Sequence, residues 1–254
     1  MMIRNFTSQE LRLAILTNQL AITLQPKVCL KTFQVIGYEA LLRWNHPRYG
    51  LIPANQWIRI AEERKLINHL TSWLISQIAT FLSQSDSPLP IAINISPASM
   101  TIPYVNQIIA ILRYHKVPSH LITLELTESL KVENYNIIAG SINMLRREGI
   151  RISLDDFGTG YNSLKTLVEL EVDEIKIDKS LIQSDHPNST LILATLANLA
   201  KEINIDIVCE GIENNTHLNR AIKINAQVGQ GYLFGKPEPI NHPLPASAAA
   251  KQFA

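Results

Sequence analysis

An alternation of short β-rich runs with amphipathic helical stretches constrains the fold of this chain more than any other feature. In the helical stretches apolar residues recur every three or four positions, as at Ile138, Ile142 and Leu145. From residue 90 onward the β-rich runs cover 90–96, 121–127, 151–155, 172–177, 205–210 and 227–233. Such alternation predicts parallel strands joined by right-handed crossovers.

Two earlier β-rich runs, 21–30 and 33–43, bring the number of predicted strands to eight. Eight strands in about 250 residues fit an α/β fold of the TIM-like (β/α)8 barrel type. A tight turn joins the first two runs, so they must be antiparallel, which departs from an ideal barrel. With 254 residues, 46% of them apolar, we expect one domain over 1–254, with a barrel core at about 10–240. We interpret residues 83–90 as a loop between helix and strand, and 241–254 as a weakly structured tail.

Charge and cysteine content exclude several classes of function. A formal net charge of +1 creates no long-range field for nucleic-acid polymers or anionic membranes, so we expect neither as a partner. Cys29 and Cys209 are too few and too far apart for a disulfide framework or a zinc site. Charged residues interrupt the first 20 residues, which therefore lack the apolar core of a signal peptide, and no segment is long enough to span a membrane. We expect a cytoplasmic protein.

In each of five β-rich runs, one polar residue lies on the strand face opposite to the aliphatic residues. Neighbouring side chains of a strand point to opposite faces, so Glu125 lies opposite Leu124 and Leu126. The residues isolated in this way are Asn94, Glu125, Asp155, Lys176 and Glu210. Barrel strands turn their aliphatic face to the helices, so these residues point inward near the C-terminal strand ends, where barrel active sites lie. One such residue alone indicates only an ordinary polar side chain, but five converging ones indicate a site.

Oxygen donors alone make up the candidate metal ligands. They are Glu39, Asn94, Glu125, Asp155, Asp156 and Glu210. Without His or Cys, this set favours magnesium, manganese or calcium over zinc. Five carboxylates carry more charge than one divalent ion balances, which favours two ions, and adjacent Asp155 and Asp156 can serve both. A two-metal site activates water and stabilises the attacking and leaving oxygens of a phosphoryl displacement, so phosphoester hydrolysis is the leading chemistry.

Three further features lie beside the predicted site. Lys176 can orient the attacking water or neutralise charge in the transition state, or it can simply pair with a carboxylate. Gly158 and Gly160, in the run Phe157-Gly158-Thr159-Gly160-Tyr161, suit either a loop that rearranges beside the metals or an ordinary strand-to-helix turn. Gln230, between two glycines at a strand end, can offer its amide to water or substrate.

The chain also resembles the EAL domain family, over roughly residues 10 to 240. The resemblance rests on the order and spacing of Gln25-Pro26, Glu39-Ala40-Leu41-Leu42-Arg43-Trp44, His46-Pro47, Ala61-Glu62, Asn94-Ile95-Ser96, Glu125-Leu126-Thr127-Glu128, Asp155-Asp156-Phe157-Gly158-Thr159-Gly160-Tyr161, Lys176-Ile177-Asp178, Glu210-Gly211-Ile212-Glu213 and Gln230-Gly231-Tyr232. It implies a barrel whose first strand is antiparallel, and hydrolysis of cyclic di-GMP to linear pGpG by a phosphodiesterase. Because the barrel uses nearly all of the chain, we expect a stand-alone EAL domain.

The resemblance implies two magnesium or manganese ions, with calcium expected to bind and inhibit. It implies metal ligation by Glu39, Asn94, Glu125, Asp155 and Asp156, with Glu210 as a ligand or general base and Lys176 holding the catalytic water. The implied substrate-binding positions are Gln25, Leu41, Arg43 and Gln230, and the supporting positions are Glu128, Glu213, Gly158 and Gly160. Gln227 replaces a frequent aspartate, which suggests a weakened contact near Gln230.

The implied partners are cyclic di-GMP, a second copy in a homodimer, and a regulatory protein still to be identified. Two alternatives stay open beside the active enzyme. One is a catalytically silent module that binds cyclic di-GMP or another protein, and the other is a metal-dependent barrel lyase such as an aldolase.

Overall fold

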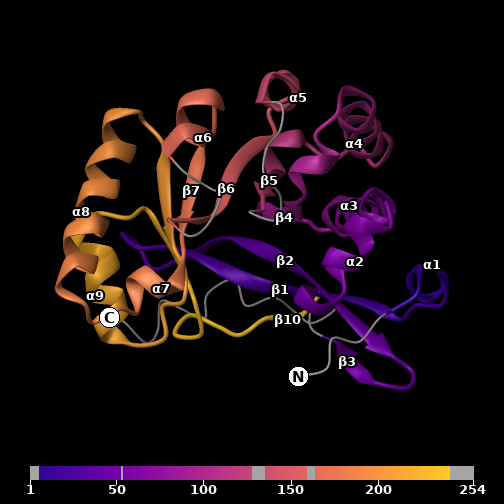
Figure 1. The fold of residues 1–254 in the computed structure, drawn as a ribbon, viewed down its shortest axis with the longest axis horizontal. Coiled ribbons are helices and arrows are strands. Elements are labelled where there is room, and N and C mark those ends of the chain that lie inside the picture. The colour runs from indigo at the N-terminus through magenta and orange to yellow at the C-terminus, as the bar shows by residue number, and fades with distance from the viewer. Residues whose placement is uncertain (1–5, 53, 128–134, 159–163, 241–254) are drawn as a thin grey trace.

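The computed structural model describes residues 6–52, 54–127, 135–158 and 164–240 (Figure 1). Within these ranges a barrel is closed by the strands β1 (Leu20–Cys29), β2 (Val35–His46), β4 (Ile91–Ile95), β5 (Ile122–Leu126), β6 (Arg151–Phe157), β7 (Glu174–Ile177), β8 (Asp206–Cys209) and β9 (Val228–Gln230). β1 is antiparallel to both β2 and β9, and the remaining neighbours are parallel. The predicted barrel with an antiparallel first strand is therefore confirmed.

Two short strands outside the barrel were not predicted from the sequence. β3 (Gly50–Ile52) pairs with the end of β2, and β10 (Glu238–Pro239) pairs with β1. Each has two or three residues, too few for an alternating pattern to be recognised. They extend the sheet without contributing to the closed barrel.

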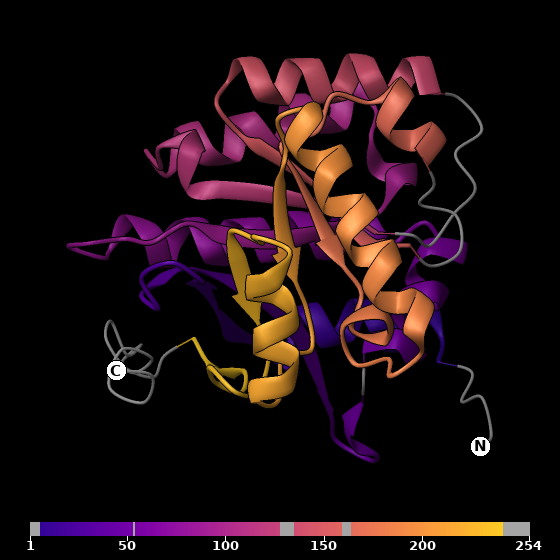
Figure 2. The same ribbon diagram turned by 90° about the vertical axis from the view of Figure 1, so that its left-hand side faces the viewer.

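Helices surround the strands, as the two perpendicular views show (Figures 1 and 2). They are α1 (Ser8–Leu16), α2 (Ile58–Glu63), α3 (Ile67–Ser83), α4 (Ile102–Tyr114), α5 (Tyr135–Arg147), α6 (Leu164–Glu169), α7 (Lys179–Ile182), α8 (Pro187–Glu202) and α9 (Asn215–Lys223), with 3₁₀ turns at Ala54–Gln56, Pro97–Ser99 and Ser119–Leu121. The loop predicted between helix and strand lies between α3 and β4. Among the described helices, none combines the length and the hydropathy needed to traverse a bilayer.

The main core lies between the outer face of the barrel and the helices. Ile93, Leu124, Ile152 and Ile175 of successive strands are at most 1% exposed and belong to this core. Burial of such a side chain contributes about 1.5–3 kcal/mol, so the aliphatic parity of each strand fixes which face turns outward. A second cluster, which includes Trp44 and Trp57, packs α1 and α2 against the end of β2. The inner face of the barrel is left to the polar residues.

Candidate metal and catalytic site

The interior of the barrel is polar and buried. Apart from His46, which packs against Trp44 at the end of β2, the buried polar side chains contributed by its strands are Gln25, Lys27, Glu39, Thr123, Glu125, Ser153, Glu174, Lys176 and Gln230. They alternate along the strands with the core residues, as the pleat requires. Because buried polar groups need partners, the ion pairs and hydrogen bonds among them define the site.

Four carboxylates from different parts of the barrel meet at one ammonium. Lys176 Nζ, on β7, lies 2.8 Å from Glu125 Oε2 and 3.3 Å from Glu39 Oε2. It also lies 2.8 Å from both Asp155 Oδ1 and Glu210 Oε1. Lys176 and Glu125 are at most 1% exposed, whereas Asp155 and Glu210 are partly accessible. The cluster thus opens toward solvent on the side of Asp155 and Glu210.

The charges of this cluster set the pKa values of its members. Burial lowers the pKa of Lys176, but the surrounding carboxylates, with Asp155 first, outweigh burial and raise it well above the usual value. Burial likewise raises the pKa of Glu39, but Lys176 and the hydrogen bonds from Gln230 and Asn94 outweigh it and lower the pKa to about 2. Lys176 is therefore a cation and Glu39 an anion at neutral pH.

Glu125 and Glu210 shift in the opposite direction. Burial is the largest cause in both, and it raises the pKa of Glu125 to about 8 and that of Glu210 to about 7. The neighbouring Asp155 and Glu39 carboxylates raise both values further, and Lys176 only partly compensates. Lys176, with Lys27 on the other side of Glu125, is not enough to keep all these carboxylates ionised, so the cluster retains protons unless further positive charge arrives.

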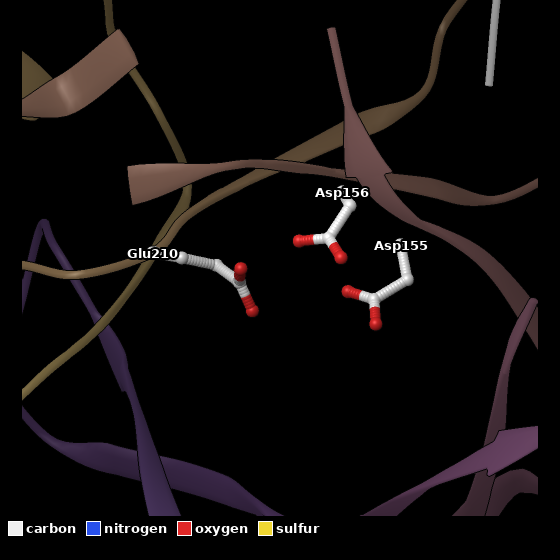
Figure 3. Close-up of side chains that lie close together, drawn as sticks. All are labelled: Asp155, Asp156 and Glu210. Atoms are coloured by element: carbon white, nitrogen blue, oxygen red, sulfur yellow. The ribbon is translucent and has the colours of Figure 1, made fainter. Parts of the chain in front are cut away.

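Asp155 and Asp156 both face Glu210, although they are adjacent on β6. Oxygens of these three side chains lie within 4.8 Å of one another, and Figure 3 shows the carboxylates turned toward a common point. A regular strand would send adjacent side chains to opposite faces. The register between β6 and β7 shifts between Leu154 and Phe157, and Asp156 has φ 49°, in the left-handed region. This irregularity brings both carboxylates to the same side.

Amides complete the surroundings of Glu39. Asn94 Nδ2 donates to Glu39 Oε1 at 2.9 Å, and Gln230 Nε2 donates to Glu39 Oε2 at 2.7 Å. Gln230 Nε2 also donates to Gln25 Oε1 at 3.1 Å. Gln230 Oε1 is buried without a hydrogen-bond partner among the described residues. It is an acceptor that a bound cation, water or ligand donor would satisfy.

A sequence model of the EAL domain matches residues 8–237. The chain belongs to the EAL domain family. Of its relatives in Pseudomonas aeruginosa, the bifunctional diguanylate cyclase/cyclic di-GMP phosphodiesterase MucR is 34% identical over 94% of this chain and 36% of its own length. The cyclic di-GMP phosphodiesterase RocR is 33% identical over 86% of this chain and 57% of its own length.

A solved structure described as the PaMucR phosphodiesterase in complex with c-di-GMP has the same fold. It aligns with a TM-score of 0.84 at 31% sequence identity, covering 91% of this chain and 96% of that chain. This chain spans between 30% and 57% of the length of the first four curated relatives. The similarity therefore concerns their EAL portion.

Several residues of the family motifs lie outside the Lys176 cluster. Leu41 and Arg43 are partly buried further along β2, where Arg43 Nη1 donates to Leu42 O at 3.1 Å. Glu213 is exposed in the loop before α9. Gly158 has φ 100°, a conformation that favours glycine, and a Cβ there would lie 3.0 Å from Leu181. Glu128 and Gly160 lie outside the described residues, so their supporting roles stay predictions.

Parity reasoning overlooked an ion pair deeper in the barrel. Lys27 Nζ lies 2.8 Å from Glu174 Oε1, and both side chains are buried. The signal was present, because Lys27 follows Gln25 by two residues and Glu174 precedes Lys176 by two.

The suggestion of a weakened contact near Gln230 is not supported by the contacts of Gln227. Its Oε1 accepts from Ile207 N at 2.8 Å and its Nε2 donates to Asn225 O at 3.1 Å. Asp173 accepts in the same way from Ile152 N at 2.9 Å. Gln227 thus supports the backbone at the beginning of β8, as Asp173 does at the beginning of β6.

Proposed function

We propose that this protein hydrolyses cyclic di-GMP to linear pGpG as a phosphodiesterase dependent on two divalent cations, with residues 1–254 acting as one domain. The observation that carries the proposal is the excess of acid around Lys176. Four carboxylates contact Lys176, and Asp156 adjoins two of them, Asp155 and Glu210. Lys27 also contacts Glu125, but Glu174 balances its charge, so the five carboxylates of the cluster against Lys176 leave four formal negative charges. Two divalent cations neutralise that excess.

The residues fit such cations in chemistry as well as in charge. All donors are carboxylate or amide oxygens, which magnesium and manganese prefer. The raised pKa values of Glu125 and Glu210 mark carboxylates that lack sufficient positive charge nearby. We assign Glu39, Asn94, Glu125 and Asp155 as metal ligands, with Asp155, Asp156 and Glu210 serving the second ion.

When bound, the two cations would supply Lewis acidity that activates water and stabilises the phosphoryl displacement. The same carboxylates that contact Lys176 would hold the cations, and Lys176 holds the attacking water and stabilises charge in the transition state. Glu210, the most accessible of the carboxylates that contact Lys176, accepts a proton as general base or completes the ligand set. Gln25, Leu41, Arg43 and Gln230 contact the substrate.

A nucleotide assay with purified protein tests the proposal. Cyclic di-GMP is incubated with magnesium, manganese or calcium in parallel, and products are separated by chromatography. We expect pGpG with magnesium and manganese, no product with calcium, and inhibition when calcium is added to the manganese reaction. Absence of pGpG with both magnesium and manganese would refute the proposed phosphodiesterase activity.

The same assay separates the enzyme from a silent binding module. A module would bind cyclic di-GMP, measured by calorimetry, without releasing pGpG. We further propose that the protein acts in the cytoplasm as a homodimer under an unidentified protein regulator. Analytical ultracentrifugation with and without cyclic di-GMP tests the dimer.

A further inference from the structure

A second buried ammonium lies beneath the Lys176 cluster. Lys27 Nζ, on β1, is 3.4 Å from Glu125 Oε1 and 2.8 Å from Glu174 Oε1. Glu125 therefore lies between two lysines, since its Oε1 faces Lys27 and its Oε2 faces Lys176 at 2.8 Å. Each oxygen of this carboxylate has its own cation, which restricts its rotation.

Glu174 contacts Lys27 from β7, a strand that does not pair with β1. β1 pairs with β2, β9 and β10, so the contact with β7 crosses the interior instead of following the sheet. Glu174 and Lys176 lie two residues apart on β7 and so share its inner face. A buried lysine beside a single carboxylate would lose much hydration, and the second carboxylate compensates that loss. The pair is neutral, so it contributes little long-range field to the cluster above it.

We infer that Lys27, held by Glu174, is a positioning residue that fixes the orientation of Glu125 for metal binding. The inference rests on the two-cation site proposed above and adds a group on the inner side of that site. Hydrogen-bond partners of metal ligands orient them, and their loss typically weakens metal affinity or activity by about 10–100-fold. A purely structural ion pair would instead contribute to folding stability and leave metal affinity unchanged.

The first test removes both members of the pair in Lys27→Met/Glu174→Gln. This double variant leaves neither charge buried alone and keeps the net charge of the interior. Titration of the full chain with Mn²⁺ in a calorimeter is expected to show a Kd about tenfold weaker than in the wild type. The matched control, Arg151→Met/Asp206→Asn, removes a pair that is 44% exposed on both sides and should leave the Kd unchanged.

A single variant, Lys27→Gln, tests the inference by the direction in which the affinity for Mn²⁺ changes. This test remains available even if the double variant does not fold. Removal of a positive charge near a cation site tightens Mn²⁺ binding if electrostatics alone acts. The inference predicts weaker binding, because the neutral amide holds Glu125 less firmly. Unchanged or tighter binding in Lys27→Gln would overturn it, as would an unchanged Kd in the double variant. Failure of the wild type to bind Mn²⁺ would instead overturn the proposed function.

Discussion

The two ends of the barrel differ in the balance between acidic and basic side chains. At the C-terminal ends of the strands, carboxylates outnumber the single ammonium of Lys176. Toward the other end and the adjoining surface, each cation is matched by acids. Lys27 contacts Glu174, with a longer contact to Glu125, Arg151 contacts Asp206, and Arg146 contacts both Asp173 and Glu171. Paired charges satisfy one another without a further partner, whereas unbalanced buried charges persist where a ligand completes them. The comparison assigns ligand binding to the acidic end. The matched charges at the other end support the fold, and among them Lys27 also contacts Glu125 of the acidic cluster.

The presence of a surface cavity does not identify the functional end of the barrel. A surface hollow of about 680 Å³ lies at the N-terminal end, lined among others by Arg146, Arg151, Asp173 and Asp206. These side chains are already engaged with one another. Barrel enzymes carry their chemistry at the C-terminal strand ends, and here the unbalanced charge lies at that end.

The largest effect is expected from Glu39→Ala at the acidic end. Loss of this carboxylate removes a proposed metal ligand, the acceptor of the Asn94 amide and one of the two acceptors of the Gln230 amide. We expect pGpG formation to fall below detection and Mn²⁺ affinity to drop, measured by nucleotide chromatography and calorimetry. Hydrolysis at the wild-type rate would refute the assignment of the site.

Lys176→Ala should lower kcat by about 10²–10⁴-fold, the usual contribution of a group that acts on the attacking water. It also removes the cation shared by four carboxylates, so the metal-free variant at pH 8 should lose roughly 3–5 kcal/mol of unfolding free energy. Added Mn²⁺ should restore more of the thermal stability of the variant than it adds to the wild type. If Mn²⁺ raised the thermal stability of both proteins equally, Lys176 and the metal would not both act by neutralising the carboxylates.

The stability of the metal-free protein should fall as pH rises from about 5 to 8. Glu125 and Glu210 have folded pKa values of about 8 and 7, raised above 4.5. A raised pKa means that the folded state holds the proton more tightly, so this contribution is complete below pH 4.5 and is lost as pH passes the folded pKa. Thermal unfolding in EDTA checks the sign, with about 2–4 °C expected for each 1 kcal/mol. A melting temperature that rises over this interval would contradict the assigned shifts.

The smallest effect is expected at the paired end, from Arg151→Met/Asp206→Asn. Both side chains are 44% exposed, and ion pairs of this kind contribute about 0–1 kcal/mol. Urea unfolding should show a change within that range, and pGpG formation should match the wild type. A loss of hydrolysis in this variant would contradict the assignment of catalysis to the acidic end of the barrel.

Much of the fold follows from local patterns. Strand and helix periods depend on neighbours in the chain, so the runs at 90–96 and 121–127 coincide with β4 and β5 to within a residue or two. β3 and β10 are too short to carry a period. β3 and β10 form by pairing with β2 and β1, respectively, and the local sequence pattern does not encode this pairing.

The sequence by itself determined which side chains face the barrel interior, because side-chain direction in a regular strand depends only on parity. The tertiary structure decided how they meet. Lys176 and Glu39 are 137 residues apart, and only closure of the barrel brings them to 3.3 Å. Asp156 joins Asp155 through a register shift between β6 and β7, against parity. Contact across a barrel depends on which strands face each other, and no local period specifies that.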